Sequence, residues 1–472
     1  MSRYGQLADQ LQQQIESGVW RAGERIPSIR QSCKTHNLSP MTVLQAYQLL
    51  ESRGLVLARP QSGYYVKAAA SPQRISAPRQ ARYSGSVDIN DLVFEVLQAS
   101  KSRELVPLGM AVADPALFPH PQLGRALGSC MRRLDPFSTV ADLPPGNEIL
   151  RRAIARRYAD DGLAVDPQEI IITTGAMEAL SLSLQVLTEP GDWVVVESPT
   201  FYGALQAIER LKLNVVEIPV RPGVGIDLAL LAQALAERPI KACWLMGNVQ
   251  HPLGHTMPDG HKEALMQLLN AHRVPLVEDD VYAELYFGRE RPRPIKCWDA
   301  RGESLLCGSF SKCLAPGFRV GWVVAGAHAE RIQRLQLIST LSTNVPSQLA
   351  LADMLRQGGV DAHFRRLRHT LAQRQQQMRA ALLRLFPEAR ISAPDGGYFL
   401  WLEFDHRLDS RALHTQALAC GFSLAPGALF SSQGQHNHCL RLNSSHPWSP
   451  AQEAALARLA ALIHQQLGTD QG

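Results

Sequence analysis

The sequence predicts an α/β fold for most of the chain, preceded by a small helical module. From about Val87 to the C-terminus, apolar runs typical of buried strands alternate with helical segments. We expect strands at 169–174, 192–198 and 275–280, and helices at 176–188, 202–211 and 261–271. Such an alternation builds a largely parallel sheet with helices on both faces. Residues 1–67 differ, because their amphipathic helices follow one another directly and are followed by only two short strands.

Length and composition indicate how the chain is organised. At 472 residues it is long enough for about three folding units. Hydrophobic residues make up 45% and charged residues 19%, which indicates globular domains with sizeable cores and excludes general disorder. We predict a compact module at 1–67, a linker at 68–86 that is rich in Ala, Ser, Pro and Arg, and a large domain at 87–472.

The sequence lacks the marks of a membrane or secreted protein. No apolar run approaches the roughly 20 residues that span a bilayer, and the polar N-terminus does not resemble a signal peptide. We therefore expect a cytoplasmic location. The eight cysteines are scattered without a C-x-x-C pair, so they are interpreted as free thiols and not as disulfides or zinc ligands. No metal site is expected.

Positive charge is concentrated at the N-terminus. Residues 1–87 contain 11 Lys and Arg against 4 Asp and Glu, whereas the rest of the chain contains 37 against 39. Nearly all of the excess positive charge therefore lies in the first fifth of the sequence. This asymmetry predicts that the N-terminal module binds a polyanion.

The N-terminal module has the pattern of a helix-turn-helix followed by a β-hairpin. An apolar stripe of Leu7, Leu11 and Ile15 predicts the first helix. Ser28 is placed to cap a second helix, and Ser39 with Pro40 to start a third. The third helix is the one expected to enter a major groove. After it, GLVLARPQSGYYV predicts two strands with a basic turn at 59–63, which would form a wing along the phosphate backbone.

These motifs resemble the GntR family of winged-helix regulators. The resemblance rests on Y…L…QI..G.W..G..IPS.R, then LS..TV..AY..L…G, and the closing R..SGYYV, and it covers nearly all of residues 1–67. It implies that the module binds double-stranded operator DNA. The alternative for Ser39 and Thr42 is that they only cap and pack the helix. Pro40 replaces a residue, often Arg, that starts the recognition helix in many members. The residues implied in DNA binding are Arg30, Ser39, Met41, Thr42 and Gly63.

The run Ser309-Phe-Ser-Lys312-Cys-Leu-Ala-Pro-Gly-Phe-Arg319-Val-Gly-Trp is the most specific signal in the large domain. A lysine amine can bond covalently to a carbonyl carbon, while a hydroxyl and a guanidinium suit a dianionic phosphate. At this spacing the run resembles the signature of fold-type I aminotransferases. The resemblance implies pyridoxal 5′-phosphate (PLP) as cofactor, Lys312 as its covalent attachment and catalytic residue, and a smaller C-terminal α/β subdomain.

Further positions match that family in the expected order. The resemblance implies that the amides of Ala176 and Met177, at a helix N-terminus, bind the phosphate. It also implies that Phe201 stacks on the pyridine ring. Asp279, chosen over Asp280 because of the Asp-x-x-Tyr spacing to Tyr282, is the implied partner of the pyridine nitrogen. Tyr282 is the implied hydrogen-bond donor to the ring hydroxyl, and Arg441 the implied clamp on a substrate carboxylate. The alternatives are that Asp279 is a buried capping acid, Tyr282 a core aromatic and Arg441 a surface cation at a strand end.

Two departures from the family pattern bear on catalysis. Where these enzymes usually have Asn-Pro-x-Gly, the chain has His251-Pro-Leu-Gly254, so His251 takes the asparagine's place beside the ring hydroxyl. A histidine with an ordinary pKa of about 6.5 could be charged or neutral there, and we expect it to titrate near neutral pH. The tyrosine usually found shortly before the glycine of LPPGNEILR (143–151) is absent. Both departures predict weak or partial transamination.

The two resemblances together indicate the MocR subgroup of GntR-type regulators. This implies a homodimer and a PLP-dependent transcription regulator that senses a small amino compound. One alternative is a working aminotransferase with a secondary DNA-binding module. Another is a regulator whose large domain only dimerises and carries no PLP. The sequence does not identify the effector, the operator or the direction of regulation.

Overall fold

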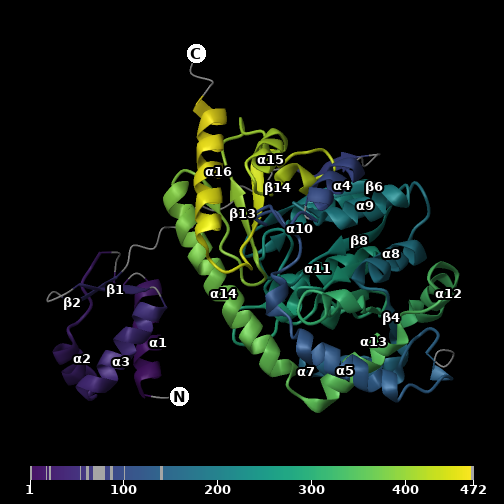
Figure 1. Cartoon of the computed structure of the whole chain (residues 1–472), viewed down its shortest axis with the longest axis horizontal. Coiled ribbons are helices and arrows are strands. Elements are labelled where there is room, and N and C mark those ends of the chain that lie inside the picture. The colour runs from purple at the N-terminus through teal and green to yellow at the C-terminus, as the bar shows by residue number, and fades with distance from the viewer. Residues whose placement is uncertain are drawn as a thin grey trace. The chain divides into compact units, whose positions relative to one another are not determined.

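The computed structural model describes residues 3–17, 19–20, 23–53, 55–59, 63–66, 80–84, 89–99, 101–138 and 142–468. The chain divides into two compact units, Met1–Gln73 and Arg74–Gly472. Figure 1 shows the first in purple and the second in blue to yellow along the chain. Within the described residues, no helix combines the length and apolarity needed to span a membrane.

The N-terminal unit is a winged helix-turn-helix, as predicted. It comprises α1 (Arg3–Glu16), α2 (Ile29–His36), α3 (Pro40–Ser52), β1 (Val56–Arg59) and β2 (Gly63–Val66), with β1 and β2 antiparallel. The predicted caps are confirmed, since Ser28 accepts from Gln31 N–H and Ser39 from Thr42 N–H, with Pro40 at the helix start. Tyr47 is buried at the centre of the core and donates through its hydroxyl to the Pro27 carbonyl at 2.7 Å.

The large unit is built on a nine-stranded sheet whose centre is parallel. The order is β3-β6-β5-β8-β9-β10-β11-β4, with β7 also paired to β6. Neighbours from β6 to β10 along this order run parallel, whereas β3, β7, β11 and β4 pair antiparallel. The strands are β3 (Arg82–Ser84), β4 (Ile170–Thr173), β5 (Trp193–Ser198), β6 (Asn214–Arg221), β7 (Gly225–Ile226), β8 (Ile240–Leu245), β9 (Leu276–Asp279), β10 (Leu305–Ser309) and β11 (Gly321–Val324).

Helices cover both faces of this sheet because its strands are apolar on both sides. In β5, Val194 and Val196 pack in the cluster that contains residues of α8 and α9, while Val195 packs with residues of α10 and α11. The helices of this part are α4 (Asn90–Ala99), α5 (His120–Arg132), α7 (Glu148–Asp160), α8 (Ala176–Leu187), α9 (Tyr202–Arg210), α10 (Leu228–Glu237), α11 (Asp259–His272), α12 (Ala329–Ser339) and α13 (Val345–Gln357).

The C-terminal part forms the smaller α/β subdomain that was predicted. A four-stranded antiparallel sheet has the order β12-β13-β15-β14. The 26-residue α14 runs along one side of the large unit toward α16 (Figure 1). The elements are α14 (Val360–Leu385), β12 (Arg390–Ile391), β13 (Phe399–Glu403), α15 (Ser410–Ala419), β14 (Ala425–Pro426), β15 (Cys439–Asn443) and α16 (Pro450–Gly468).

Short 3-10 turns connect several of these elements: η1 (Pro115–Leu117), η2 (Pro167–Glu169), η3 (Ala283–Leu285), η4 (Ile295–Trp298), η5 (Pro316–Phe318), η6 (Gly326–His328) and η7 (Gly427–Phe430). The region expected to be a linker, 68–86, is described only at residues 80–84. Three of these residues, Arg82–Ser84, form β3 and pair with β6, so this part of the expected linker belongs to the large sheet. Tyr83 explains the pairing, because its ring packs against Trp193 of the same sheet and its hydroxyl donates to Glu237.

Candidate functional site

The predicted site residues of the large domain gather at one edge of its sheet. Parallel strands present their carboxyl ends at a common edge, where open α/β sheets form their binding crevices. Asp279 ends β9 and Ser309 ends β10, with Lys312 three residues further on. The segments that follow β5 and β8 carry Phe201 and His251.

Lys312 lies within this crevice with its amine partly neutralised. Its Nζ donates to the Ala111 carbonyl at 3.2 Å and lies 5.6 Å from the centroid of the Tyr282 ring. Burial lowers the pKa of Lys312 to about 8; the positive charge of Arg441 adds to this effect and the carboxylate of Asp279 opposes it. In a large fraction of the protein molecules, Lys312 is therefore the free amine, which is the nucleophilic form, at mildly alkaline pH.

Asp279 has one carboxyl oxygen without a partner. The residue is fully buried, and its Oδ1 accepts the Val281 N–H at 3.4 Å. Oδ2 has no hydrogen-bond donor among the described residues. Trp244 lies close enough to lower the pKa slightly, although its indole N–H makes no hydrogen bond of ordinary length to Asp279. Burial dominates and raises the pKa of Asp279 to about 7, so a cation placed at Oδ2 would stabilise its charged form.

His251 packs directly against Tyr282 and Arg441. Its ring is 2% exposed and stacks on Tyr282 at 5.8 Å with an interplanar angle of 17°. Arg441 Nη1 lies 3.1 Å from His251 Nε2. A guanidinium can only donate, so we assign Nε2 as the acceptor and place the imidazole proton on Nδ1. Nδ1 is buried without a partner among the described residues.

The environment of His251 overturns one expectation. Burial, followed by the positive charges of Arg441 and Lys312, lowers the pKa of His251 well below its ordinary value. The imidazole is therefore neutral throughout the physiological range and does not titrate near pH 6.5. The sequence could not show this, because the shift depends on burial in the folded protein and, after that, on charged groups about 60 and 190 positions away in the chain.

Arg441 is a fully internal cation. It lies on β15 at 1% exposure, with its guanidinium 4.2 Å from the centroid of the Phe399 ring. Its Nη2 donates to the carbonyl of Gly109, and its Nε has no partner among the described residues. In the structure the guanidinium of Arg441 therefore donates to a backbone carbonyl. A carboxylate would be a stronger acceptor for the same donor.

A second cluster, around Arg319, suits a phosphate. Arg319 has a left-handed backbone and donates through Nη1 to Ser311 Oγ at 3.3 Å. Its guanidinium lies so close to Gly175 that a side chain at that position would collide with it. Gly175 precedes α8, so the free amides of Ala176 and Met177 point from the first turn of the helix.

Ser309 belongs to the same cluster, and its Oγ accepts the Ser311 N–H at 2.9 Å. The sequence did not identify Ser311, although it lies between Ser309 and Lys312, because the aminotransferase motif pointed only to the hydroxyl at the position of Ser309. It also missed Tyr398, which donates to the Ala111 carbonyl at 3.3 Å. The carbonyls of Gly109 and Ala111 could not be found from residue types at all, since every residue has one.

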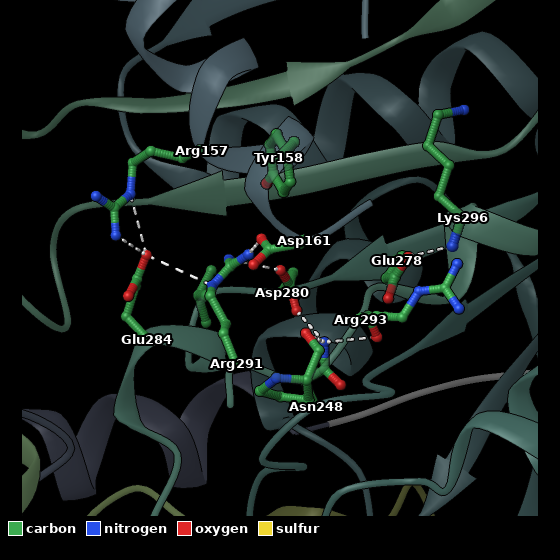
Figure 2. A network of polar contacts seen from close by, with 12 residues as sticks. Arg157, Tyr158, Asp161, Asn248, Glu278, Asp280, Glu284, Arg291, Arg293 and Lys296 are labelled. Carbon is green, nitrogen blue, oxygen red and sulfur yellow. Dashed lines mark hydrogen bonds and ion pairs between the residues drawn. The ribbon is translucent and has the colours of Figure 1, made fainter. Parts of the chain in front are cut away.

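A buried polar network supports the end of β9 from behind (Figure 2). Asp280 accepts from Asn248 Nδ2 at 2.8 Å and faces Arg291 at 3.4 Å. Asn248 also accepts from the buried Lys262 Nζ at 2.7 Å, and Arg291 pairs further with Asp161. Asn248 lies in the segment that leads to His251. The network therefore fixes the strand that carries Asp279 and the segment that carries His251 relative to each other, and it uses Asp280 for that purpose.

The DNA-binding candidates lie on the surface of the N-terminal unit. Arg30 is exposed on α2 and has no partner among the residues that the structure describes there. Met41 is 64% exposed at the start of α3. Ser39 Oγ accepts from Thr42 N–H and pairs with the Thr42 hydroxyl at 2.8 Å, so Ser39 caps this helix and Thr42 is its partner. Gly63, with φ +106°, lies against the guanidinium of Arg25 at the start of β2, next to the turn of the wing.

Comparison with known protein families identifies both units. The family of bacterial regulatory proteins named gntR matches residues 3–66, and the aminotransferase class I and II family matches residues 137–454. The uncharacterized HTH-type transcriptional regulator YdcR of Escherichia coli is 51% identical over 472 residues, covering 99% of this chain and all of its own length.

Two solved aminotransferase structures resemble the large unit. The multiple substrate aminotransferase of Thermococcus profundus has a TM-score of 0.74 at 28% identity, covering 80% of this chain and 95% of its own. The α-aminoadipate aminotransferase LysN of Thermus thermophilus has a TM-score of 0.73 at 27% identity with the same coverage. That structure contains N-(5′-phosphopyridoxyl)-L-leucine.

Proposed function

The chain belongs to the MocR-type group of HTH transcription regulators, in which a GntR helix-turn-helix domain is joined to an aminotransferase-like domain, and we propose that it binds PLP and changes its operator binding in response to a small amino compound. The observation that carries the proposal is the set of unpartnered buried polar atoms in the crevice: Asp279 Oδ2, His251 Nδ1 and Arg441 Nε. Buried polar groups are costly without partners, so their convergence beside Lys312 favours a polar ligand.

The residues present fit PLP. Lys312 would hold it covalently, Asp279 its ring nitrogen, and His251 with Tyr282 its ring hydroxyl. Phe201 would pack on the ring, and its edge contact with His251, with 5.4 Å between the ring centroids, supports this role. The phosphate would lie among Ser309, Ser311, Arg319 and the amides of Ala176 and Met177. When bound, the cofactor supplies an electron-withdrawing ring and a carbonyl carbon that reacts with amines.

An effector would use the remaining cation. Arg441 is the buried guanidinium nearest to both Lys312 and His251, and a carboxylate can replace the Gly109 carbonyl as its partner. A molecule with an amine and a carboxylate therefore suits the site. The homodimer is part of the proposal, and it is supported by exposed apolar side chains on and after α12, with Leu337 45%, Ile338 82% and Leu341 58% exposed.

The test compares operator binding by the PLP-loaded and PLP-free full-length protein while an equimolar mixture of amino acids is titrated in. We expect the operator dissociation constant of the loaded protein to change by about five- to 150-fold, the usual range of allosteric coupling, and that of the free protein to stay constant. The loaded protein should sediment as a dimer. An identical response without PLP, or a monomer, would contradict the proposal. Sustained turnover with a keto acid would favour the alternative of a working aminotransferase.

The DNA contacts are tested separately with Arg30→Ala. Because Arg30 is exposed and has no described partner, we expect weaker operator binding with little loss of stability. Removing one phosphate contact should also lower the slope of log K against log salt by about 1, since one fewer counterion is released. Lys241→Ala, an exposed change in the large unit, is the control. If the salt slope of Arg30→Ala equals that of the control, Arg30 does not contact the phosphate backbone.

A further inference from the structure

The first helix of the large unit, α4, borders the crevice beside Arg441. We infer that the effector is a small aliphatic amino monocarboxylate, whose side chain occupies a cavity lined by α4. This inference rests on the proposed function and extends it by naming the class of compound and the helix that would detect it.

The cavity is small and apolar. It has a volume of about 10 Å³, close to that of one water-sized group. Val93, Val96 and Leu97 of α4 form one wall, and Ala425 and Leu429 of the C-terminal subdomain form another. Val93 and Val96 are also part of the main hydrophobic core, so this wall is fixed by packing. Such a cavity accepts a methyl-sized side chain and is too small for an aromatic or long aliphatic side chain unless α4 shifts.

The charged side chain at the cavity favours an effector with a single carboxylate. Among the residues that the structure describes, the polar side chains that line this cavity are those of Arg441 and Tyr202. Arg441 would be occupied by one carboxylate, and no second cation lines the cavity. A second carboxylate on the effector would therefore be buried without a counter-charge, which is strongly unfavourable. Tyr202 does not change this, because a phenol gives one neutral hydrogen bond. Acidic amino acids are excluded on this ground.

The position of α4 suits it to respond when the effector's side chain occupies the cavity. Asn90 on α4 accepts from Gln206 of α9 at 2.8 Å, and α9 begins at Tyr202, which also lines the cavity; Figure 1 shows the two helices close together. In the sequence, α4 is the first helix after β3, which follows the segment that leads from the DNA-binding unit. A side chain that fills the cavity would contact α4, the helix of the large unit that is closest in sequence to the DNA-binding unit.

The test uses the full-length PLP-loaded protein and titrates glycine, L-alanine, L-leucine, L-phenylalanine and L-aspartate separately. The half-saturation concentration is read from the change in absorption of the bound cofactor, and operator binding is measured in parallel. We expect L-alanine to act at a concentration at least about tenfold lower than L-leucine, L-phenylalanine or L-aspartate, because one methylene in a tight apolar cavity changes selectivity by about 10- to 200-fold.

Val96→Ala enlarges the cavity and should move the preference toward L-leucine by about tenfold. Leu97→Ala, which lines the same cavity from a position 42% exposed, is the second variant in case Val96→Ala folds poorly. Phe94→Ala, on the outward side of α4 at 64% exposure, is the matched control and should keep the parent's ranking.

The outcomes separate the two proposals. If PLP gives no absorption band of a lysine-linked cofactor, the proposed function fails. If the band forms and responds, but L-leucine, L-phenylalanine or L-aspartate acts at the lowest concentration, the inference is overturned and the proposed function stands. The same holds if both cavity variants keep the parent's ranking.

Discussion

Lys312→Ala is expected to abolish covalent PLP binding completely. Borohydride treatment of the PLP-loaded parent should fix one cofactor per chain on Lys312, and the variant should carry none. The reason is positional, since this lysine lies where Asp279, Arg441 and Arg319 all act on its charge. Operator binding without effector should be unchanged, because α1–α3 and their wing form a unit with its own core. The response to amino compounds should be lost.

Lys241→Ala provides the matched control for this experiment. Lys241 is an exposed lysine of the same unit, on β8, and its removal should leave both the reducible adduct and the effector response intact. Peptide mapping after reduction locates the cofactor. A reducible covalent PLP adduct in Lys312→Ala would show that another lysine carries the cofactor, and the assignment of Lys312 would be wrong.

The fold was predictable because its signals are local. Val194, Val195 and Val196 form an apolar run that is typical of a strand buried on both faces, and in the structure alternate members of it pack against different helices. Ser39 followed by Pro40 predicts a helix start from two residues, and α3 begins there. Each of these patterns depends on a few neighbouring side chains and on backbone geometry that is the same in every protein.

The interior of the site was less predictable because it depends on distant groups. The resemblance placed His251 beside the cofactor's ring hydroxyl, but it could not show that burial and the nearby charge of Arg441 keep the imidazole neutral. Nor could it show that the carbonyls of Gly109 and Ala111 occupy Arg441 and Lys312. Strand β3 was missed and fell within the expected linker. A three-residue edge strand has too few residues to show an alternating pattern.

The choice between Asp279 and Asp280 rested on spacing alone. In the structure the two carboxylates face different surroundings, and the partners of Asp280 come from Asn248 and Arg291. Asp279 instead interacts electrostatically with Lys312. The role of Asp279 toward the cofactor stays a prediction.

Capture of PLP by Lys312 should depend on pH with a midpoint near 8, far below the ordinary lysine pKa of about 10.4. Only the free amine attacks PLP, so the rate of capture rises as the pH increases through the pKa that Lys312 has in the folded protein. The pKa is lowered because burial and the charge of Arg441 penalise the ammonium form, while Asp279 favours it. The measurement is the rate of reducible PLP incorporation at limiting PLP between pH 6 and 10.

Two substitutions should move that midpoint in opposite directions. Arg441→Gln removes a positive neighbour, so the ammonium form becomes less costly and the midpoint should rise by about one pH unit. Asp279→Asn removes the negative neighbour, so the midpoint should fall by a similar amount. Weaker PLP binding in either variant lowers the rate at every pH but leaves the midpoint in place, which separates a charge effect from a structural one. If both variants keep the parent's midpoint, neither residue acts on Lys312 through its charge, and the crevice around the amine is more open to water than its buried position implies.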